Sequence, residues 1–215
     1  MELIIRLEEP KDHRIVEEMT REAFWNLHVP GCDEHLLAHQ LRKCAAFVPE
    51  LDFVAVSGGD IVGNIMYCRA KVVTDGGMSR DVLTFGPVSV WPHLQRKGVG
   101  SALITHSLKA AAELGFASVL IYGDPAYYRR FGFTGAKAFG IRTAEGSFHP
   151  ALMARELVSG ALSGVSGRFY EGEGYQVDQR ALEAFDRTFP HKEKLITESQ
   201  KRFAEMSSAC ESDVP

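Results

Sequence analysis

The sequence predicts an α/β (α+β) fold in which one sheet carries helices on both faces. Short apolar runs typical of strands alternate with segments of helical spacing along most of the chain. Hydrophobic residues make up 45% and charged residues 24% of the 215 residues, which is an ordinary globular balance. Helices inserted among several strands imply a sheet that is covered on both sides.

The first half of the chain is expected to contain two helices and four strands. Asp12 can cap a helix whose apolar residues, from Ile15 to Leu27, fall on one face. Asp33 can cap a second helix that ends before Pro49. Strands are expected at 3–7, 53–56, 61–73 and 82–90, and the last three are joined by turns at 58–60 and 75–77.

The second half begins with a helix over 101–114 and a strand over 118–122. Asp124 and Pro125 are typical of the first positions of a helix, so a short helix should begin there. Gly132 should end that helix, and Phe133 should enter the next strand. A further strand is expected at 152–157.

The composition changes after residue 158. We therefore expect one domain over 1–158, a glycine-rich connector or hairpin over 159–175, and a helical extension over 176–215. Two helices of the extension have apolar residues at helical spacing: Leu182, Phe185 and Phe189 before Pro190, and Ile196, Phe203 and Met206 after it. Because isolated helices of this size are marginal, they should dock on the domain, and a homodimer contact is the alternative. Residues 207–215 are expected to form a frayed tail.

Charge and composition exclude several classes of function. The net charge of −4 argues against a protein that binds nucleic acid. No run approaches the ~20 apolar residues of a membrane span, and the first residues carry no signal-peptide core. The four cysteines form no Cys-x-x-Cys pair, so they are interpreted as thiols of a reducing compartment. We therefore expect a cytoplasmic enzyme domain without a membrane partner.

The segment between the strand at 82–90 and the helix at 101–114 is the strongest functional signal. Gly98 and Gly100 allow close approach of an anion to backbone N–H groups at a helix start, and Arg96 and Lys97 add charge. A P-loop needs lysine after its last glycine, and a dinucleotide fingerprint needs a third glycine where Leu103 stands. Neither motif is therefore present. The ligand is still expected to carry phosphates, bound by these backbone N–H groups and cations, and an ordinary glycine-rich turn is the alternative.

The pattern Gln95-x-x-Gly98-x-Gly100 resembles the acetyl-CoA pyrophosphate loop of the GNAT N-acetyltransferase superfamily. The phrase Tyr128-x-x-x-Gly132-Phe133, in the matching place after the next strand, looks like the tyrosine-bearing helix of that superfamily. The run from 123 to 133 further resembles its YhbS-like branch. The resemblance covers about residues 1–158. It implies a GNAT-type mixed, mostly antiparallel sheet and acetyl transfer from acetyl-CoA to a primary amine, without a metal.

The resemblance also implies where the cofactor binds. In the family, one strand parts from its neighbour beside the loop, and Gly86 and Pro87 fit such a disruption because proline donates no hydrogen bond. The expected contacts to acetyl-CoA come from that strand and from the loop: Val88, Ser89, Val90, Gln95, Arg96, Lys97, Gly98, Val99, Gly100 and Ser101.

Tyr128 matches the family tyrosine that faces the CoA sulfur. A phenol of pKa ~10 can donate a proton to the leaving thiolate, and hydrogen bonding to the CoA arm without proton transfer is the alternative. Tyr127 occupies an apolar position of the family pattern, so packing is expected for it.

The general base and the acceptor are not identified by any pattern. Many family members carry a carboxylate in the strand that corresponds to 82–90, and this chain has no Asp or Glu there. The candidates for the base are His28, Asp33 and Glu34, from the bend between the first two helices, or a chain of water molecules. The same three side chains are the candidates for contact with the acceptor, and ordinary surface, capping or solvated roles are the alternative. A CoA-binding sensor without efficient catalysis, or a transferase of longer acyl groups, stays open at this point.

Overall fold

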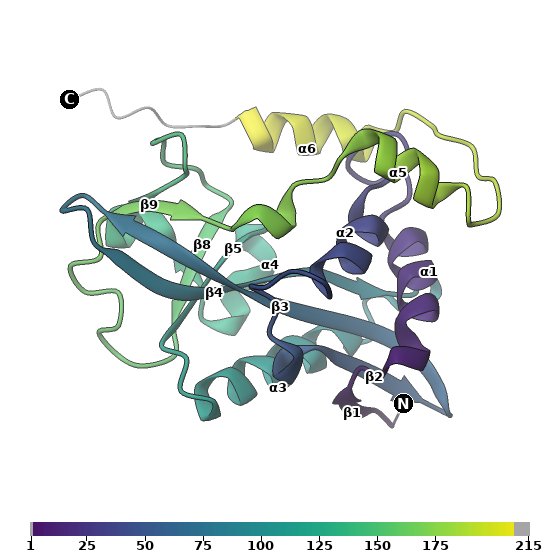
Figure 1. Cartoon of the computed structure of the whole chain (residues 1–215), viewed down its shortest axis with the longest axis horizontal. Coiled ribbons are helices and arrows are strands. Elements are labelled where there is room, and N and C mark those ends of the chain that lie inside the picture. Colours follow the sequence, from purple (N-terminus) through teal and green to yellow (C-terminus); the bar gives the residue numbers. More distant parts are fainter. Residues whose placement is uncertain (1, 209–215) are drawn as a thin grey trace.

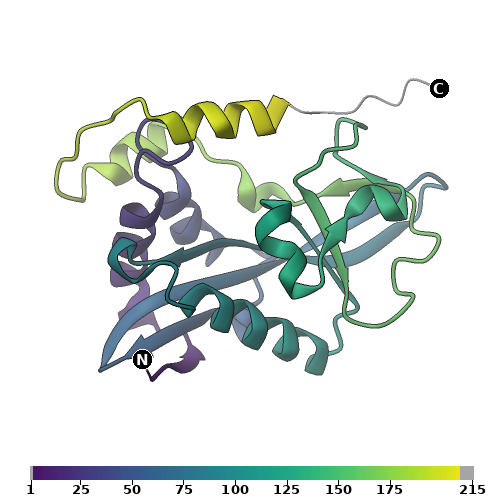
Figure 2. The ribbon, with the colours of Figure 1, turned by 180° about the vertical axis from the view of Figure 1, so that it is seen from behind.

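The computed structural model describes residues 2–208 and shows one mixed sheet with helices on both faces (Figure 1). Helices α1 (His13–Phe24) and α2 (Glu34–Leu41) pack on one face, against the side chains of Val54, Ile61, Met66 and Cys68. Helix α3 (Val99–Glu113) packs on the other face, together with the short α4 (Pro125–Tyr128), and Figure 2 shows both from behind. The predicted fold class is confirmed.

The sheet is mostly antiparallel. Its strands, in spatial order, are β1 (Ile4–Leu7), β2 (Phe53–Ser57), β3 (Asp60–Thr74), β4 (Ser79–Val90), β5 (Ser118–Tyr122), β8 (Leu152–Glu156) and β6 (Thr134–Gly135). Strand β9 (Gly167–Tyr170) pairs with β3 and with the short β7 (Ile141–Arg142). Only the pairs β4–β5 and β7–β9 are parallel among the described strands.

Strands β4 and β5 pair at a single register position, Leu83 opposite Val119. Beyond it β4 continues to Val90 and β5 to Tyr122 without further pairing, so the two strands part. A register shift between Ile65 and Tyr67 of β3 lies opposite this part of β4 and accommodates Gly86 and Pro87. Both features agree with the disruption expected from the sequence.

Several boundaries differ from the sequence prediction. Asp12 does not cap α1, because its carboxylate accepts hydrogen bonds from the Arg6 guanidinium and the Glu9 N–H. Asp33 is the N-cap residue of α2, but its side chain accepts no hydrogen bond from the first turn of that helix. Helix α2 ends at Leu41, well before Pro49, and α3 begins two residues earlier than predicted.

A buried ion-pair network fixes α1 and α2 to the sheet. The Arg42 guanidinium after α2 lies 2.7 Å from the Glu8 carboxylate and 3.2 Å from that of Glu17 in α1. Glu17 also lies 2.8 Å from the Nδ1 atom of His39. Because breaking such a buried network leaves uncompensated charge, it holds α1 and α2 in a defined position relative to the end of β1.

The C-terminal segment belongs to the same sheet and docks on the same domain. The stretch 159–175 contains β9, whose Phe169 side chain is fully buried beside β3. Helix α5 (Gln179–Asp186) is tied to α1 by the Arg21–Asp186 ion pair of 2.7 Å. Helix α6 (Glu198–Ser208) places the ring of Phe203 on His28, with centroids 4.3 Å apart. Docking of the extension is therefore confirmed.

Part of the predicted tail is helical. Ser207 and Ser208 belong to α6, whereas 209–215 and the side chain of Met206 lie outside the described residues.

Phe169→Ala tests whether the C-terminal segment contributes to the core. Removing this fully buried ring should lower the free energy of unfolding by about 3–5 kcal/mol. Val158→Ala, at a site that is 54% exposed, should change it by less than about 0.5 kcal/mol. Urea unfolding followed by circular dichroism measures both. Equal stability of Phe169→Ala and wild type would contradict integration of β9.

Candidate active site

The loop that leads from β4 into α3 has a fixed and unusual backbone. The side-chain amide of Gln95 donates to the carbonyl oxygen of Val90 at 3.2 Å, which ties the loop to the end of β4. Arg96 and Gly98 both have left-handed backbones, with φ of +60° and +93°. An arginine rarely adopts this conformation, so the loop holds Arg96 in a strained geometry of the kind that gathers at functional sites.

The N-terminus of α3 is built to receive an anion. No side chain caps it, because Gly98 is the N-cap residue. The N–H groups of Val99, Gly100 and Ser101 have no partner within the helix, and the helix dipole adds positive potential there. The Val99 side chain is buried in the core and anchors the helix start, so its backbone rather than its side chain faces the site.

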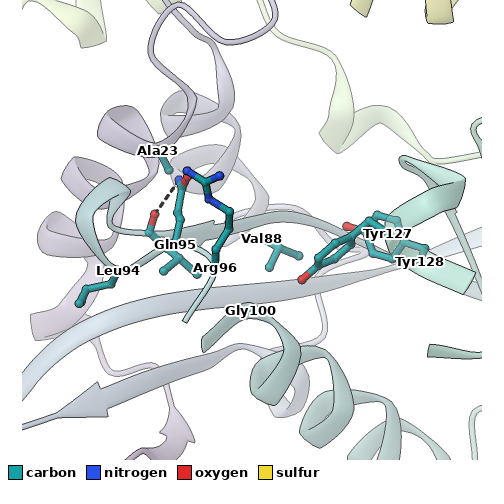
Figure 3. Close-up of a pocket in the computed structure, with 9 residues that line it drawn as sticks. Ala23, Val88, Leu94, Gln95, Arg96, Gly100, Tyr127 and Tyr128 are labelled. Atoms are coloured by element: carbon teal, nitrogen blue, oxygen red, sulfur yellow. Dashed lines mark hydrogen bonds between the residues drawn. The ribbon is translucent and has the colours of Figure 1, made fainter. Parts of the chain in front are cut away.

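A cavity of about 250 Å³ lies between this loop and α4 (Figure 3). Its lining comes from α1, β4, the loop, α3 and α4: Ala23, Val88, Val90, Leu94, Gln95, Arg96, Gly100, Tyr127 and Tyr128. Figure 3 shows Val88 between the loop residues Gln95 and Arg96 on one side and the two tyrosines on the other. The cavity therefore joins the anion-binding end of α3 to the place where β4 and β5 part.

The short helix α4 presents both tyrosines to this cavity. The Asp124 carboxylate caps α4 by accepting from the Ala126 N–H at 2.8 Å, as predicted, and Gly132 ends the following turn. The Tyr128 ring packs on Phe85 and Phe133, with centroids 5.9 and 5.8 Å away. Burial raises the pKa of Tyr128 well above its usual value, so its phenol keeps its proton throughout the neutral range.

Tyr127 packs against the core, as expected, and it also lines the cavity. Its hydroxyl lies beside the first turn of α3, since a Cβ placed on Gly100 would be 3.3 Å from Tyr127 Oη. The Arg130 guanidinium lies over its ring, 4.5 Å from the centroid. Tyr127 thus faces the ligand end of the cavity together with Tyr128, and nothing in the local pattern distinguished the two orientations.

The predicted cofactor residues fall into two groups. Val88, Val90, Gln95, Arg96 and Gly100 line the cavity together with Tyr128, the predicted catalytic residue. The others do not line it: Ser89, Lys97, Gly98, Val99 and Ser101. Ser89 is fully buried, and its hydroxyl lies 2.8 Å from that of Thr20 on α1, so only its backbone remains for a ligand. The sequence reasoning missed Ala23 and Leu94, because apolar residues from distant elements carry no local signal.

The three predicted acceptor residues lie away from this cavity. His28 Nδ1 is 3.1 Å from the Glu34 carboxylate, and the His28 ring stacks on Phe203 of α6. Burial, together with the neighbouring Glu34, raises the pKa of the Asp33 carboxyl. The bend between α1 and α2 thus supports the docked C-terminal helix, and these side chains do not line the cavity beside Tyr128.

The residues that the structure describes include no group of three or more histidine, cysteine, aspartate or glutamate side chains able to hold a metal ion. Within the same part of the chain, no helix has the length and apolar character needed to cross a membrane. Cys68 is buried in the core, and burial raises the pKa of its thiol to about 12.

Comparison with known proteins places this geometry in a family. Residues 11–136 match the family described as acetyltransferase (GNAT) domain. The uncharacterized N-acetyltransferase YhbS of Escherichia coli (strain K12) is 28% identical over 166 residues, which cover 77% of this chain and 93% of that protein.

Two solved structures share the fold. The crystal structure of YhbS from Escherichia coli in complex with CoA superposes with a TM-score of 0.71 at 26% identity, covering 80% of this chain and 91% of that one. A GNAT family acetyltransferase from Brucella melitensis, solved with acetyl-CoA, superposes with a TM-score of 0.63 at 24% identity, covering 81% and 99%.

Gly98→Ala tests the loop geometry against a matched control at Gly115. Both glycines have left-handed backbones, and a Cβ at either meets open space, so each substitution should cost about 1–2 kcal/mol of folding free energy. Only Gly98 shapes the anion site. We expect Gly98→Ala alone to weaken CoA binding, by about tenfold in isothermal titration calorimetry. Equal affinities of the two variants would refute the role of the loop.

Proposed function

Because the chain belongs to the GNAT acetyltransferase family, we propose that it transfers an acetyl group from acetyl-CoA to a primary amine by direct attack in a ternary complex. The observation that carries the proposal is the cavity at the parting of β4 and β5. It combines an uncapped helix N-terminus for the phosphates with a protonated tyrosine at its far end. Relatives solved with CoA and acetyl-CoA share this fold.

The donor is proposed to bind along the loop and the edge of β4. The N–H groups at the start of α3 and the Arg96 guanidinium would hold the pyrophosphate. Beyond Leu83, β4 has no partner on the β5 side, so the backbone groups of 88–90 that face this side, apart from the Val90 carbonyl bound by Gln95, are available to the amides of the pantetheine arm. One of these N–H groups would also polarise the thioester carbonyl and stabilise the oxyanion of the tetrahedral intermediate.

Tyr128 is proposed to assist departure of the thiolate. The neutral amine forms a bond to the thioester carbon, and collapse of the tetrahedral intermediate breaks the carbon–sulfur bond. The sulfur leaves as a thiolate with an ordinary pKa near 8.5, and the Tyr128 hydroxyl donates a hydrogen bond or its proton to it. Because burial raises the pKa of Tyr128, the phenol remains a donor even in mildly alkaline solution.

Tyr128→Phe should lower kcat for acetyl transfer by about 10²-fold or more while leaving acetyl-CoA affinity within threefold of wild type. The control is Tyr67→Phe, which deletes a buried phenol hydroxyl from the same core but outside the cavity. The control should retain wild-type turnover, and wild type should show no alkaline loss of rate from Tyr128 below pH ~10, since its pKa is raised.

Thiol release and calorimetric titration with acetyl-CoA supply these values. A wild-type protein that binds no acetyl-CoA would overturn the proposed function. Unchanged kcat in Tyr128→Phe would remove only the role of the tyrosine.

A further inference from the structure

A second and larger cavity lies under the C-terminal segment. Its volume is about 420 Å³, within the range of small-molecule sites. Residues of β3, β5, β9 and the turn after β9 line it, and those that matter here are Lys71, Tyr122, Glu145, Phe169, Glu171 and Tyr175. Figure 1 shows the segment between β9 and α5 crossing the sheet beside α2. The cavity is therefore built by a part of the chain to which no function has been assigned.

The segment that covers this cavity is held firmly. At one end, Tyr170 of β9 pairs with Lys71 of β3. At the other, Gln40 of α2 donates to the carbonyl oxygens of Gly174 and Gln176, both at 2.8 Å. Gly174 also lies so close to α2 that a Cβ there would be 3.0 Å from Leu41 Cδ2. Residues 171–173 between these anchors thus have a defined position above the sheet.

This cavity borders the same two strand ends as the donor cavity. On β4, the Tyr175 hydroxyl donates to the carbonyl oxygen of Gly86 at 3.3 Å, just before Val88 of the donor cavity. On β5, Tyr122 lines the second cavity, and the ring of Tyr128 packs directly on the next residue, Gly123. Both cavities therefore lie near the place where β4 and β5 part.

Among the described residues that line this cavity, only Glu171 has a half-buried carboxylate. Within residues 2–208, no ion pair or hydrogen bond holds its carboxylate. Loss of solvent alone raises its pKa to about 7, so an appreciable fraction is ionised at neutral pH. An ionised carboxylate with such a pKa is suited to accept a proton from an amine.

Resting on the proposed function, we propose that Glu171 is the general base that deprotonates the acceptor, and that this cavity binds a cationic alkylamine. The aromatic rings of Tyr122, Phe169 and Tyr175 suit an ammonium group and its alkyl chain. Glu145 and Glu173 add negative charge at the rim, against one cation, Lys71. The other titratable groups that line the cavity are the phenols of Tyr122, Tyr170 and Tyr175.

The proton balance of the step is complete. The ammonium gives one proton to the Glu171 carboxylate, which frees the nitrogen lone pair for attack on the thioester carbon. The carbon–sulfur bond then breaks, and the thiolate takes a proton from Tyr128. The second nitrogen proton returns to the Tyr128 phenolate by way of solvent. The products are the amide, the CoA thiol and one proton that leaves Glu171 for solvent.

The test compares two acceptors of different basicity in wild type, Glu171→Gln and the control Glu183→Gln, whose side chain is exposed on α5. Spermidine is protonated at pH 7 and needs a base, whereas aniline is already neutral. Thiol release at saturating acetyl-CoA is measured from pH 5.5 to 9, and acetyl-CoA affinity is measured by calorimetry. We expect Glu171→Gln to lower kcat/KM for spermidine about 10²-fold or more and for aniline less than threefold.

The pH profile provides a readout that a structural role would not change. In wild type, kcat/KM for spermidine should rise through about pH 7 as Glu171 ionises. This rise of kcat/KM with pH should be absent in Glu171→Gln. Equal losses with both amines, or none with either, would overturn the assignment of the base. Acetyl-CoA binding without turnover of spermidine would overturn the acceptor class and leave the donor site standing. Absence of acetyl-CoA binding would overturn the proposed function and this inference with it.

Discussion

The single paired position between β4 and β5 is the constraint on which the site depends. Leu83 and Val119 hold the two strands together at one point, and the bulge opposite Met66 turns the rest of β4 away. Unpaired backbone groups inside a fold require partners, and a ligand of alternating amides and carbonyls can supply them. The loop before α3 and the turn of α4 follow the ends of these two strands, so their positions are consequences of the same divergence.

Several residues that line the first cavity were predictable from the sequence because their signals are local. Gln95, Gly98 and Gly100 lie within one loop, and Tyr128 follows the next strand at a characteristic distance from Gly132. The sequence did not place Glu171 in a site, because its surroundings come from β3 and β5, far away along the chain. The capping role expected for Asp12 was wrong for a related reason, since Arg6 competes for its carboxylate through tertiary contact. Local propensity predicts the role of a residue when its neighbours in sequence determine that role, and it fails when tertiary contacts determine it.

Burial acts on two groups of the site in the same direction with different results. Desolvation favours the neutral form of both Tyr128 and Glu171. For the phenol, this secures the proton that a leaving thiolate needs. For the carboxyl, it brings the pKa to about 7, where both protonation states are populated at neutral pH. Under our proposals, an acid and a base on either side of the parted strands are thus adjusted by one physical effect rather than by dedicated charged partners.

Residues 171–173 are anchored between β9 and α2, so substitutions in this turn and substitutions in the donor site affect different parts of the protein. Substitutions in this short turn alter the wall of the second cavity without touching the loop before α3 or the tyrosines of α4. If the two cavities bind the donor and the acceptor as proposed, related proteins can diverge in the amine they accept while the acyl donor stays the same. Sequence variation among relatives should accordingly concentrate at Gly172 and Glu173, whereas Glu171 and the donor loop should remain nearly constant.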